Sequence, residues 1–207
     1  MDFVHPVEAV IPGTQGRVLA VLAETTAELN LRTVARLADV SPAQASRVLP
    51  VLVDLGLVDR REVPPSSLFQ LNRTNLAASL VVELSRLRAR ALKAMGAAAA
   101  ELPMPPSSVI VFGSFARREA DRHSDIDTVI VRPDDTDADD DTWTVGIERW
   151  RETVESITGN RVEVIETDLA EVAEKLRSNR PLWRDVARDG VEVHGMTLDQ
   201  LREASRA

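Results

Sequence analysis

Three prolines, at positions 103, 105 and 106, divide the 207-residue chain into two parts with different hydrophobic patterns. Before them, apolar residues recur about every 3.6 positions, as in amphipathic helices. After them, continuous apolar runs at 109–112 and 126–131 indicate buried strands, and helical patterns lie between and after them. Because proline is unfavourable inside a helix, the cluster also ends the helical pattern that begins near residue 75. We therefore expect a two-domain α+β protein.

Composition excludes several classes of protein. The chain contains no cysteine, which excludes disulfides, thiolate metal sites and a cysteine nucleophile. No apolar run approaches the ~18 residues that suggest a membrane span. The N-terminus lacks the basic and apolar regions of a secretion signal. We therefore expect a cytoplasmic protein with no membrane partner.

Charge is distributed unevenly along the chain. Residues 1–100 carry 11 Arg and Lys against 9 Asp and Glu, whereas residues 101–207 carry 14 against 24. Such an asymmetry suggests separate tasks for the two parts. The acidic C-terminal part is suited to divalent cations, and the N-terminal part can contact DNA only through a local patch.

Residues 14–72 predict three helices followed by two short strands. The first helix starts at Thr14 and includes Leu29 in its pattern, the second covers 31–38, and the third starts at Pro42. Ser41 and Gln44 form a capping box, and Gly56 is placed to end the third helix. Strands are expected at 57–58 and 68–71, with 60–67 as a loop. The expected apolar face of the third helix consists of Ala45, Val48, Leu49, Leu52 and Leu55, and Pro50 predicts a kink in it.

This order is that of a winged helix–turn–helix, and residues 33–58 resemble helix–turn–helix repressors of the MarR/ArsR kind. The resemblance implies that the domain binds a DNA operator, with Gln44 and Arg47 reading bases in the major groove. Arg60 and Arg61 in the loop would contact phosphates. Such proteins often dimerise to match palindromic operators, so we expect a homodimer. The alternative is a module that mediates only protein contacts.

Residues 75–102 predict one long helix with an apolar stripe formed by Leu76, Leu80, Leu84, Leu87 and Leu92. We accordingly expect a winged helix–turn–helix domain at 1–74, a connecting helix at 75–104 and a second domain at 105–207. The connecting helix either packs between the domains or forms a dimer seam.

The segment from Gly113 to Asp127 carries the chemistry. A strand ends at Gly113-Ser114, a short helix follows, and the next strand opens with Asp125-Ile126-Asp127. Side chains two apart on a strand share a face, so Asp125 and Asp127 project together. Two such carboxylates suit Mg²⁺, which is usually held by one or two carboxylates and by substrate phosphates. The Gly-Ser turn offers backbone N–H groups to a phosphate.

Gly-Ser, ten further residues and Asp-x-Asp resemble the signature of the DNA polymerase β-like nucleotidyltransferase superfamily. The string Gly-Ser-Phe-Ala-Arg…Ser-Asp-Ile-Asp is similar to its minimal nucleotidyltransferase branch, over about residues 105–195. The resemblance implies a mixed sheet, Mg²⁺ bound by Asp125 and Asp127, and nucleotide bound by Gly113, Ser114, Arg117 and Ser124. A glycine commonly follows the arginine in this family, whereas Arg118 occupies that position here, which puts the loop shape in question.

The family also carries a third acid on a later strand. Residues 161–166 contain two candidates, of which Glu163, between two valines, matches better than Glu166. By analogy, Glu163 would deprotonate the acceptor hydroxyl or help to hold the catalytic metal.

The resemblance implies transfer of an NMP from an NTP to a protein, tRNA or small-molecule acceptor, with two Mg²⁺ ions and release of pyrophosphate. The fused DNA-binding module suggests autoregulation, as in toxin–antitoxin systems. Two alternatives stay open: a transcriptional regulator whose transferase domain only senses nucleotide, and an antibiotic nucleotidyltransferase.

Several of these side chains also have simpler interpretations. Arg117 is as compatible with a surface ion pair as with a phosphate contact. His123 is expected in a loop without a catalytic role. The acidic run 134–141 lacks the glycine and glutamate of an EF-hand, which favours a solvated loop.

Overall fold

The computed structural model describes residues 1–204 and divides into two compact units. One unit is His5–Leu87, and the other joins Met1–Val4 to the chain from Arg88 onward. The first unit therefore extends past the boundary expected at residue 74. The single helix expected over 75–102 is wrong, because it is interrupted at Arg86, whose φ of −101° and ψ of 11° are not helical. The two resulting helices are α5 (Leu76–Ser85) and α6 (Leu87–Ala100).

The His5–Leu87 unit has the element order of a winged helix–turn–helix. Its elements are α1 (Pro6–Val10), α2 (Thr14–Glu24), β1 (Leu29–Asn30), α3 (Leu31–Leu37), α4 (Pro42–Asp54), β2 (Val58–Val63), β3 (Ser66–Leu71) and α5. The three strands form an antiparallel sheet in the order β1-β3-β2. Leu29 therefore lies in a strand and not in the first helix, where the sequence pattern placed it.

Local signals set the ends of the helices in this unit. The predicted capping box is confirmed, because the Ser41 hydroxyl accepts from the Gln44 backbone N–H at 3.1 Å and the Gln44 carboxamide oxygen accepts from the Ser41 N–H at 2.9 Å. Gly56 follows α4 with a left-handed φ of 70°, which a glycine adopts without strain. The helix runs through Pro50 to Asp54.

Two apolar sequence patterns predicted buried helix faces, but some of their leucines are exposed in the structure. Leu55 of the expected α4 face is 61% exposed, because the helix ends at Asp54 and Leu55 is its C-cap. Leu76 and Leu80 are 87% and 65% exposed. The buried face of α5 is formed instead by the smaller side chains of Ala78, Val81 and Val82.

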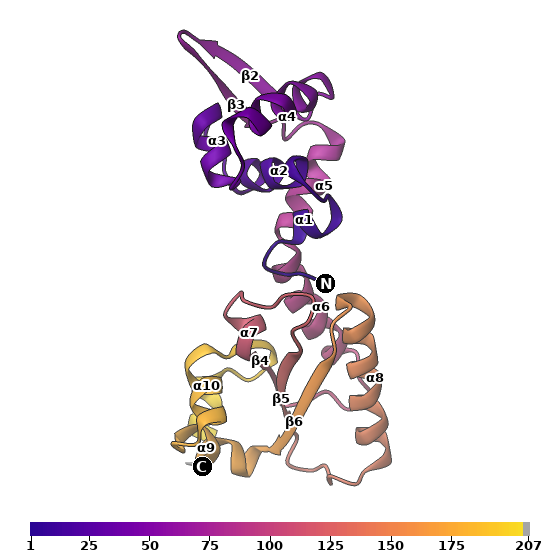
Figure 1. Cartoon of the computed structure of the whole chain (residues 1–207). Coiled ribbons are helices and arrows are strands. Elements are labelled where there is room, and N and C mark those ends of the chain that lie inside the picture. The colour runs from indigo at the N-terminus through magenta and orange to yellow at the C-terminus, as the bar shows by residue number, and fades with distance from the viewer. Residues whose placement is uncertain (205–207) are drawn as a thin grey trace. The chain divides into compact units, whose positions relative to one another are not determined.

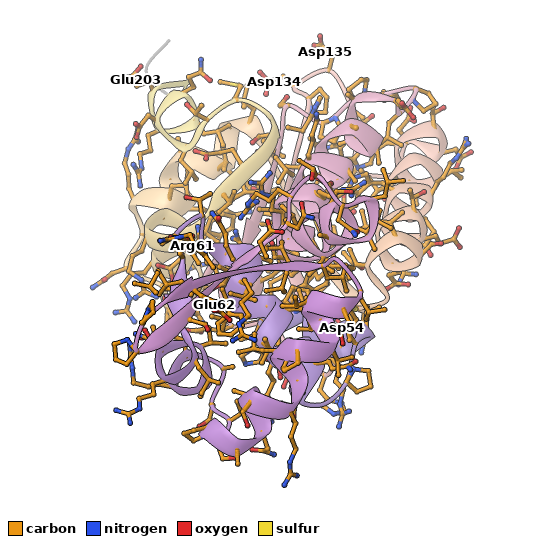
Figure 2. All side chains as sticks on the ribbon, turned by 90° about the horizontal axis from the view of Figure 1, so that it is seen from above. Asp54, Arg61, Glu62, Asp134, Asp135 and Glu203 are labelled. Carbon is orange, nitrogen blue, oxygen red and sulfur yellow. The ribbon has the colours of Figure 1, made fainter. Side chains whose placement is uncertain are left out.

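The wing is longer than expected. Most of residues 60–67, expected as a loop, continue the two strands, and the register runs from Val58 opposite Leu71 to Val63 opposite Ser66. Pro64 and Pro65 form the turn. Arg60 and Arg61 consequently lie on strand β2 and not in a loop. Arg61 is labelled in Figure 2.

The second unit contains a mixed four-stranded sheet. Its elements are α6, β4 (Ser108–Phe112), α7 (Gly113–Ala116), β5 (Ile126–Arg132), α8 (Asp141–Thr158), β6 (Val162–Asp168), α9 (Leu169–Arg177), α10 (Pro181–Asp189), β7 (Val191–Gly195) and α11 (Leu198–Ala204). The strand order is β6-β5-β4-β7, with β5 and β6 parallel and the other pairs antiparallel. This confirms the expected α+β class with a mixed sheet.

Helices cover both faces of this sheet (Figure 1). On one face, Ile110, Phe112 and Val129 pack in a core with residues of α9, α10 and α11. On the other face lies α8, whose Trp150 is 1% exposed and donates its indole N–H to the Met95 carbonyl of α6 at 3.0 Å. The acidic loop 133–140 precedes α8, and its Asp134 and Asp135 are exposed at the edge of the molecule (Figure 2). Among residues 1–204, no helix is both long and apolar enough to cross a membrane.

Candidate active site

The sheet brings the predicted acidic residues together at one end of β5. Asp127 lies opposite Phe112, the last residue of β4, and opposite Glu163 on β6. Residues paired in this way project to the same face, so Asp127 and Glu163 share a face. Strand β5 begins at Ile126, so Asp125 lies just before the strand and not in it, where the sequence pattern placed it. The charge of Asp125 is nevertheless close enough to raise the pKa of Asp127. The buried Thr128 donates its hydroxyl to the Glu163 carbonyl at 2.9 Å, which holds β6 against β5 at this point.

Gly113 allows the turn after β4 to approach the Asp127 carboxylate. Its φ is +69°, and a Cβ at this position would lie 2.3 Å from Asp127 Oδ2. A Cβ cannot lie so close to an oxygen, so a side chain at position 113 would require the Asp127 carboxylate or the turn to shift, and the left-handed φ independently favours glycine. The backbone of the Gly113–Ser114 turn and the Asp127 carboxylate are therefore in direct contact.

The electrostatics of this corner favour a cation. Burial raises the pKa of the Asp127 carboxyl, and the nearby charges of Asp125 and Glu163 raise it further, whereas Arg117 acts in the opposite direction. Carboxylates gathered in this way repel one another unless a positive charge is placed between them. Within residues 1–204, however, no three His, Cys, Asp or Glu side chains are close enough to hold a metal ion by themselves. The site fits Mg²⁺ held by two carboxylates, with substrate phosphates supplying further ligands.

The two candidates for the third acid lie in different surroundings. Glu163 shares the face of Asp127, is 46% exposed and forms an ion pair with Arg161 at 2.7 Å. Glu166 lies opposite Ile130, on the other face of the sheet, where it accepts the Trp143 indole N–H at 2.8 Å. Only Glu163 is therefore placed beside Asp127.

Arg117 follows α7 and is held in ion pairs. Its guanidinium contacts the Glu119 carboxylate at 2.8 Å and the Asp189 carboxylate at 3.4 Å. Asp189, at the end of α10, also binds Arg188 at 2.7 Å, and its side chain is 15% exposed. The hydrogen bond to Glu119, followed by Asp189, raises the pKa of Arg117. These contacts are ion pairs, as the simpler interpretation of Arg117 expects. The guanidinium also lies close enough to Asp127 to act on its pKa.

Ser124 shapes the turn that leads into Asp125. Its hydroxyl donates to the Asp121 carboxylate at 3.0 Å and accepts from the Asp121 backbone N–H at 3.0 Å. The backbone N–H of His123, followed by the Ser124 hydroxyl, lowers the pKa of Asp121. Ser124 therefore has a structural role in this turn, and His123 lies in the loop as expected.

An arginine at position 118, where the family commonly has glycine, put the shape of this loop in question, and the structure shows its backbone conformation. Its φ is +66°, in the left-handed region where glycine is favoured. The loop thus has the shape that a glycine would give it, although the residue is an arginine.

In the N-terminal unit, the four predicted DNA contacts differ in availability. The Gln44 carboxamide oxygen accepts the Ser41 N–H in the capping box, and base reading by Gln44 stays a prediction. Arg47 on α4 is exposed. Arg60 pairs with Glu62 at 3.1 Å, and Arg61 donates its Nε–H to Glu28 at 2.8 Å. These wing arginines therefore have carboxylate partners within the protein.

A groove of about 870 Å³ separates α3 and α4 from the β2–β3 hairpin. Arg32, Ser46, Arg60 and Phe69 contribute to its walls. Arg32 was not among the predicted DNA contacts, because the helix pattern alone did not place it beside the wing.

Comparison with known proteins assigns both parts of the chain. A nucleotidyltransferase domain model matches residues 97–193, and a MarR family model matches residues 11–66. The chain carries a MarR-family segment followed by a nucleotidyltransferase domain. Among curated proteins, no sequence matched the chain.

Several solved structures match parts of the chain. A crystal structure of a toxin–antitoxin with AMP-PNP is 16% identical, covers 57% of this chain and 79% of its own, and has a TM-score of 0.35. A MarR family transcriptional regulator from Rhodococcus sp. RHA1 is 22% identical, covers 42% of this chain and 67% of its own, and has a TM-score of 0.30. A protein from Mycobacterium tuberculosis is 28% identical, covers 48% of this chain and 72% of its own, and has a TM-score of 0.33. At such TM-scores the likeness carries no functional argument.

Three residues around the nucleotidyltransferase site were not found from the sequence. Asp189 holds Arg117 from a distant helix. Asn160 is buried and donates to the carbonyls of Asp121 at 3.0 Å and Ser124 at 2.9 Å, which fixes the turn before Asp125. Arg88 contacts α7. None of them stands in a local motif, so their roles depend on contacts that only the fold reveals.

Proposed function

We propose that the nucleotidyltransferase domain transfers an NMP from an NTP to an acceptor hydroxyl and releases pyrophosphate. The observation that carries the proposal is the contact between the Gly113 turn and the Asp127 carboxylate, with Asp125 and Glu163 beside it. This arrangement supports the proposal, because a turn at the start of a helix lies directly next to carboxylates that favour a cation. Such a juxtaposition is what transfer from an Mg²⁺-bound triphosphate requires.

Asp125 and Asp127 would hold the Mg²⁺ ions, expected to be two, together with phosphate oxygens. Bound there, the metal neutralises the charge that develops on the phosphoryl oxygens during transfer. Gly113 and Ser114 bind and orient the triphosphate. Arg117, fixed by Glu119 and Asp189, adds positive charge at this end of the sheet.

Glu163 is proposed as the base that takes the proton from the attacking hydroxyl. Its side chain is 46% exposed, so an acceptor from solution can reach it, and its only recorded ion-pair partner in residues 1–204 is Arg161. A general base must lie within hydrogen-bond reach of the proton that it removes, and the position of Glu163 as an exposed carboxylate on the Asp127 face supports this assignment. The acceptor is proposed to be a protein, an RNA or a small molecule.

We further propose that the MarR-family segment binds a DNA operator, as a homodimer, and thereby controls expression of its own gene in the manner of a toxin–antitoxin system. The family assignment of residues 11–66 supports DNA binding. The exposed Arg47 on α4 and the groove between α4 and the wing provide a surface for it.

The test is label transfer from each of the four α-³²P-labelled NTPs with Mg²⁺, into RNA and protein fractions and into aminoglycosides in separate reactions. Asp125→Asn and Asp127→Asn serve as active-site controls, since they keep the side-chain shape and remove the charge. Label that disappears in both variants supports the transferase and identifies the base and the acceptor class. Mg²⁺-NTP binding without any transfer would instead support a regulator that senses nucleotide.

A further inference from the structure

The helix that carries the Gly113–Ser114 turn is too short to hold its own conformation. Helix α7 has four residues, and a single helical turn costs more conformational entropy than its few hydrogen bonds return. Its last carbonyls, like those at any helix end, have no partner within the helix unless the following loop or a side chain provides one. The position of this turn therefore depends on groups outside α7.

Arg88, in the first turn of α6, provides such groups. Its Nε–H donates to the Phe115 carbonyl at 2.7 Å, and one terminal N–H donates to the Ala116 carbonyl at 2.6 Å. The guanidinium also lies 5.8 Å from the centroid of the Phe115 ring. A cation near the last carbonyls of a helix is favourable, and the planar guanidinium directs its two donors at neighbouring carbonyls in a fixed geometry that the ammonium of a lysine lacks.

Phe3 holds the same segment from another side. Its backbone N–H donates to the Ala120 carbonyl at 3.0 Å, and its ring meets the Phe115 ring edge-on, with centroids 4.8 Å apart. Phe115 is fully buried between these partners. The chain leaves this unit after Val4, next to Phe3, and re-enters it at Arg88.

We propose that Arg88 is a positioning residue of the transferase, which fixes the Gly113–Ser114 turn for the NTP phosphates by holding the last two carbonyls of α7. It acts through the turn and does not touch the nucleotide. The turn tolerates little displacement, because Gly113 is already in contact with the Asp127 carboxylate. The proposal rests on the proposed function, since it assumes that the turn binds triphosphate.

The test compares Arg88→Lys with the wild type and with Arg149→Lys, a matched control on the exposed surface of α8 in the same unit. The probe is the Mg²⁺ complex of each α,β-methylene NTP, whose dissociation constant is measured by calorimetry. Arg88→Lys keeps the charge but loses the two-donor geometry, so we expect binding to weaken about tenfold, as for other residues that orient a binding group. Arg149→Lys should bind as the wild type does, and the thermal midpoints of both variants should stay within about 2 °C of it.

Hydrogen exchange supplies a readout that a general loss of stability would not move. In Arg88→Lys, the amides of residues 113–120 should exchange faster while those of β5 and α8 keep their protection. Millimolar methylguanidinium should restore nucleotide binding to Arg88→Ala, whereas tetramethylammonium should not. Together, weaker binding, local exchange and selective rescue would establish the positioning role.

A failure of the proposed function and a failure of the Arg88 proposal give different results. If the wild type binds none of the four nucleotides with Mg²⁺, the proposed function fails and this proposal falls with it. If the wild type binds and folded Arg88→Lys binds equally well, only the role of Arg88 is overturned. If both Arg88→Lys and Arg88→Ala fail to fold, Arg88 is a general structural residue, and that result also overturns the proposal.

Discussion

Replacing Gly113 by alanine should separate a backbone effect from an effect on the active site. At Gly113 the φ is +69°, and a left-handed conformation costs an L-residue about 1–2 kcal/mol. Alanine recovers about 0.4–1 kcal/mol by restricting the unfolded chain. The backbone contribution to Gly113→Ala is therefore about 1 kcal/mol of destabilisation, or about 3–6 °C in the thermal midpoint of a domain of this size.

The active-site effect comes from the new methyl group. It would lie 2.3 Å from Asp127 Oδ2, whereas ordinary contact begins at 3.4 Å, so one of the two groups must move by about 1 Å. Strand β5 is paired on both sides at Asp127, with Phe112 and with Glu163, so the carboxylate or the turn moves and the strand does not. A displacement of about 1 Å at a reacting centre costs about 100-fold in rate.

Gly159→Ala is the matched control. Gly159 has a φ of +71° at the C-cap of α8, and the nearest atom to a Cβ there is 3.6 Å away. It should lose the same stability without a clash, as measured by thermal denaturation, and should retain label transfer and Mg²⁺-NTP binding. If folded Gly113→Ala transfers label within a few-fold of Gly159→Ala, the inference that the turn and Asp127 form one rigid site is refuted.

Three further outcomes are expected. Burial and the acidic neighbours of Asp127 raise its pKa in the folded protein, so its ionisation lowers the free energy of unfolding as the pH rises through that raised value. Asp127→Asn should therefore increase the thermal midpoint of the nucleotide-free protein at neutral pH. At acidic pH the midpoint should be nearly unchanged. Glu166→Ala leaves the Trp143 N–H without its partner and should lower the free energy of unfolding by about 1–3 kcal/mol in denaturant titrations. Glu163→Gln should abolish transfer and leave stability unchanged. Loss of transfer in Glu166→Ala and loss of stability in Glu163→Gln would exchange the two roles. Arg47→Ala should weaken binding to a duplex selected by the wild type by about 1–3 kcal/mol in a fluorescence titration, and unaltered affinity would exclude α4 as the reading helix.

Elements whose signals are local could be predicted from the sequence. The capping box of Ser41 and Gln44 fixes the start of α4 through hydrogen bonds three residues apart. Alternation along a strand predicts that Asp125 and Asp127 share a face, but β5 begins at Ile126 and leaves Asp125 just outside it. The sequence favoured Glu163 over Glu166 because two valines flank it; the pairing of β6 with β5, which the sequence does not show, puts Glu163 on the Asp127 face.

The features that sequence analysis missed depend on tertiary contacts. A leucine stripe predicted the buried face of α5, but packing in the first unit buries Ala78, Val81 and Val82 and leaves Leu76 exposed. Helix propensity favoured an unbroken helix through Arg86, whereas the chain leaves one unit for the other immediately after it. Hydrophobic spacing alone does not determine which face of a helix the rest of its own unit will cover.

Arg118 shows how packing can determine a loop shape that its own residue disfavours. An arginine at φ +66° carries a cost of about 1–2 kcal/mol that glycine would avoid. The conformation persists because its neighbours are fixed: the Glu119 N–H donates to the Ser114 carbonyl at 2.8 Å, and Arg88 holds the carbonyls of α7 before it. Contacts around the loop therefore hold a conformation that the arginine itself disfavours. The identity of residue 118 alone does not determine the shape of this loop, because Arg88 and the residues of α7 fix the backbone that precedes it.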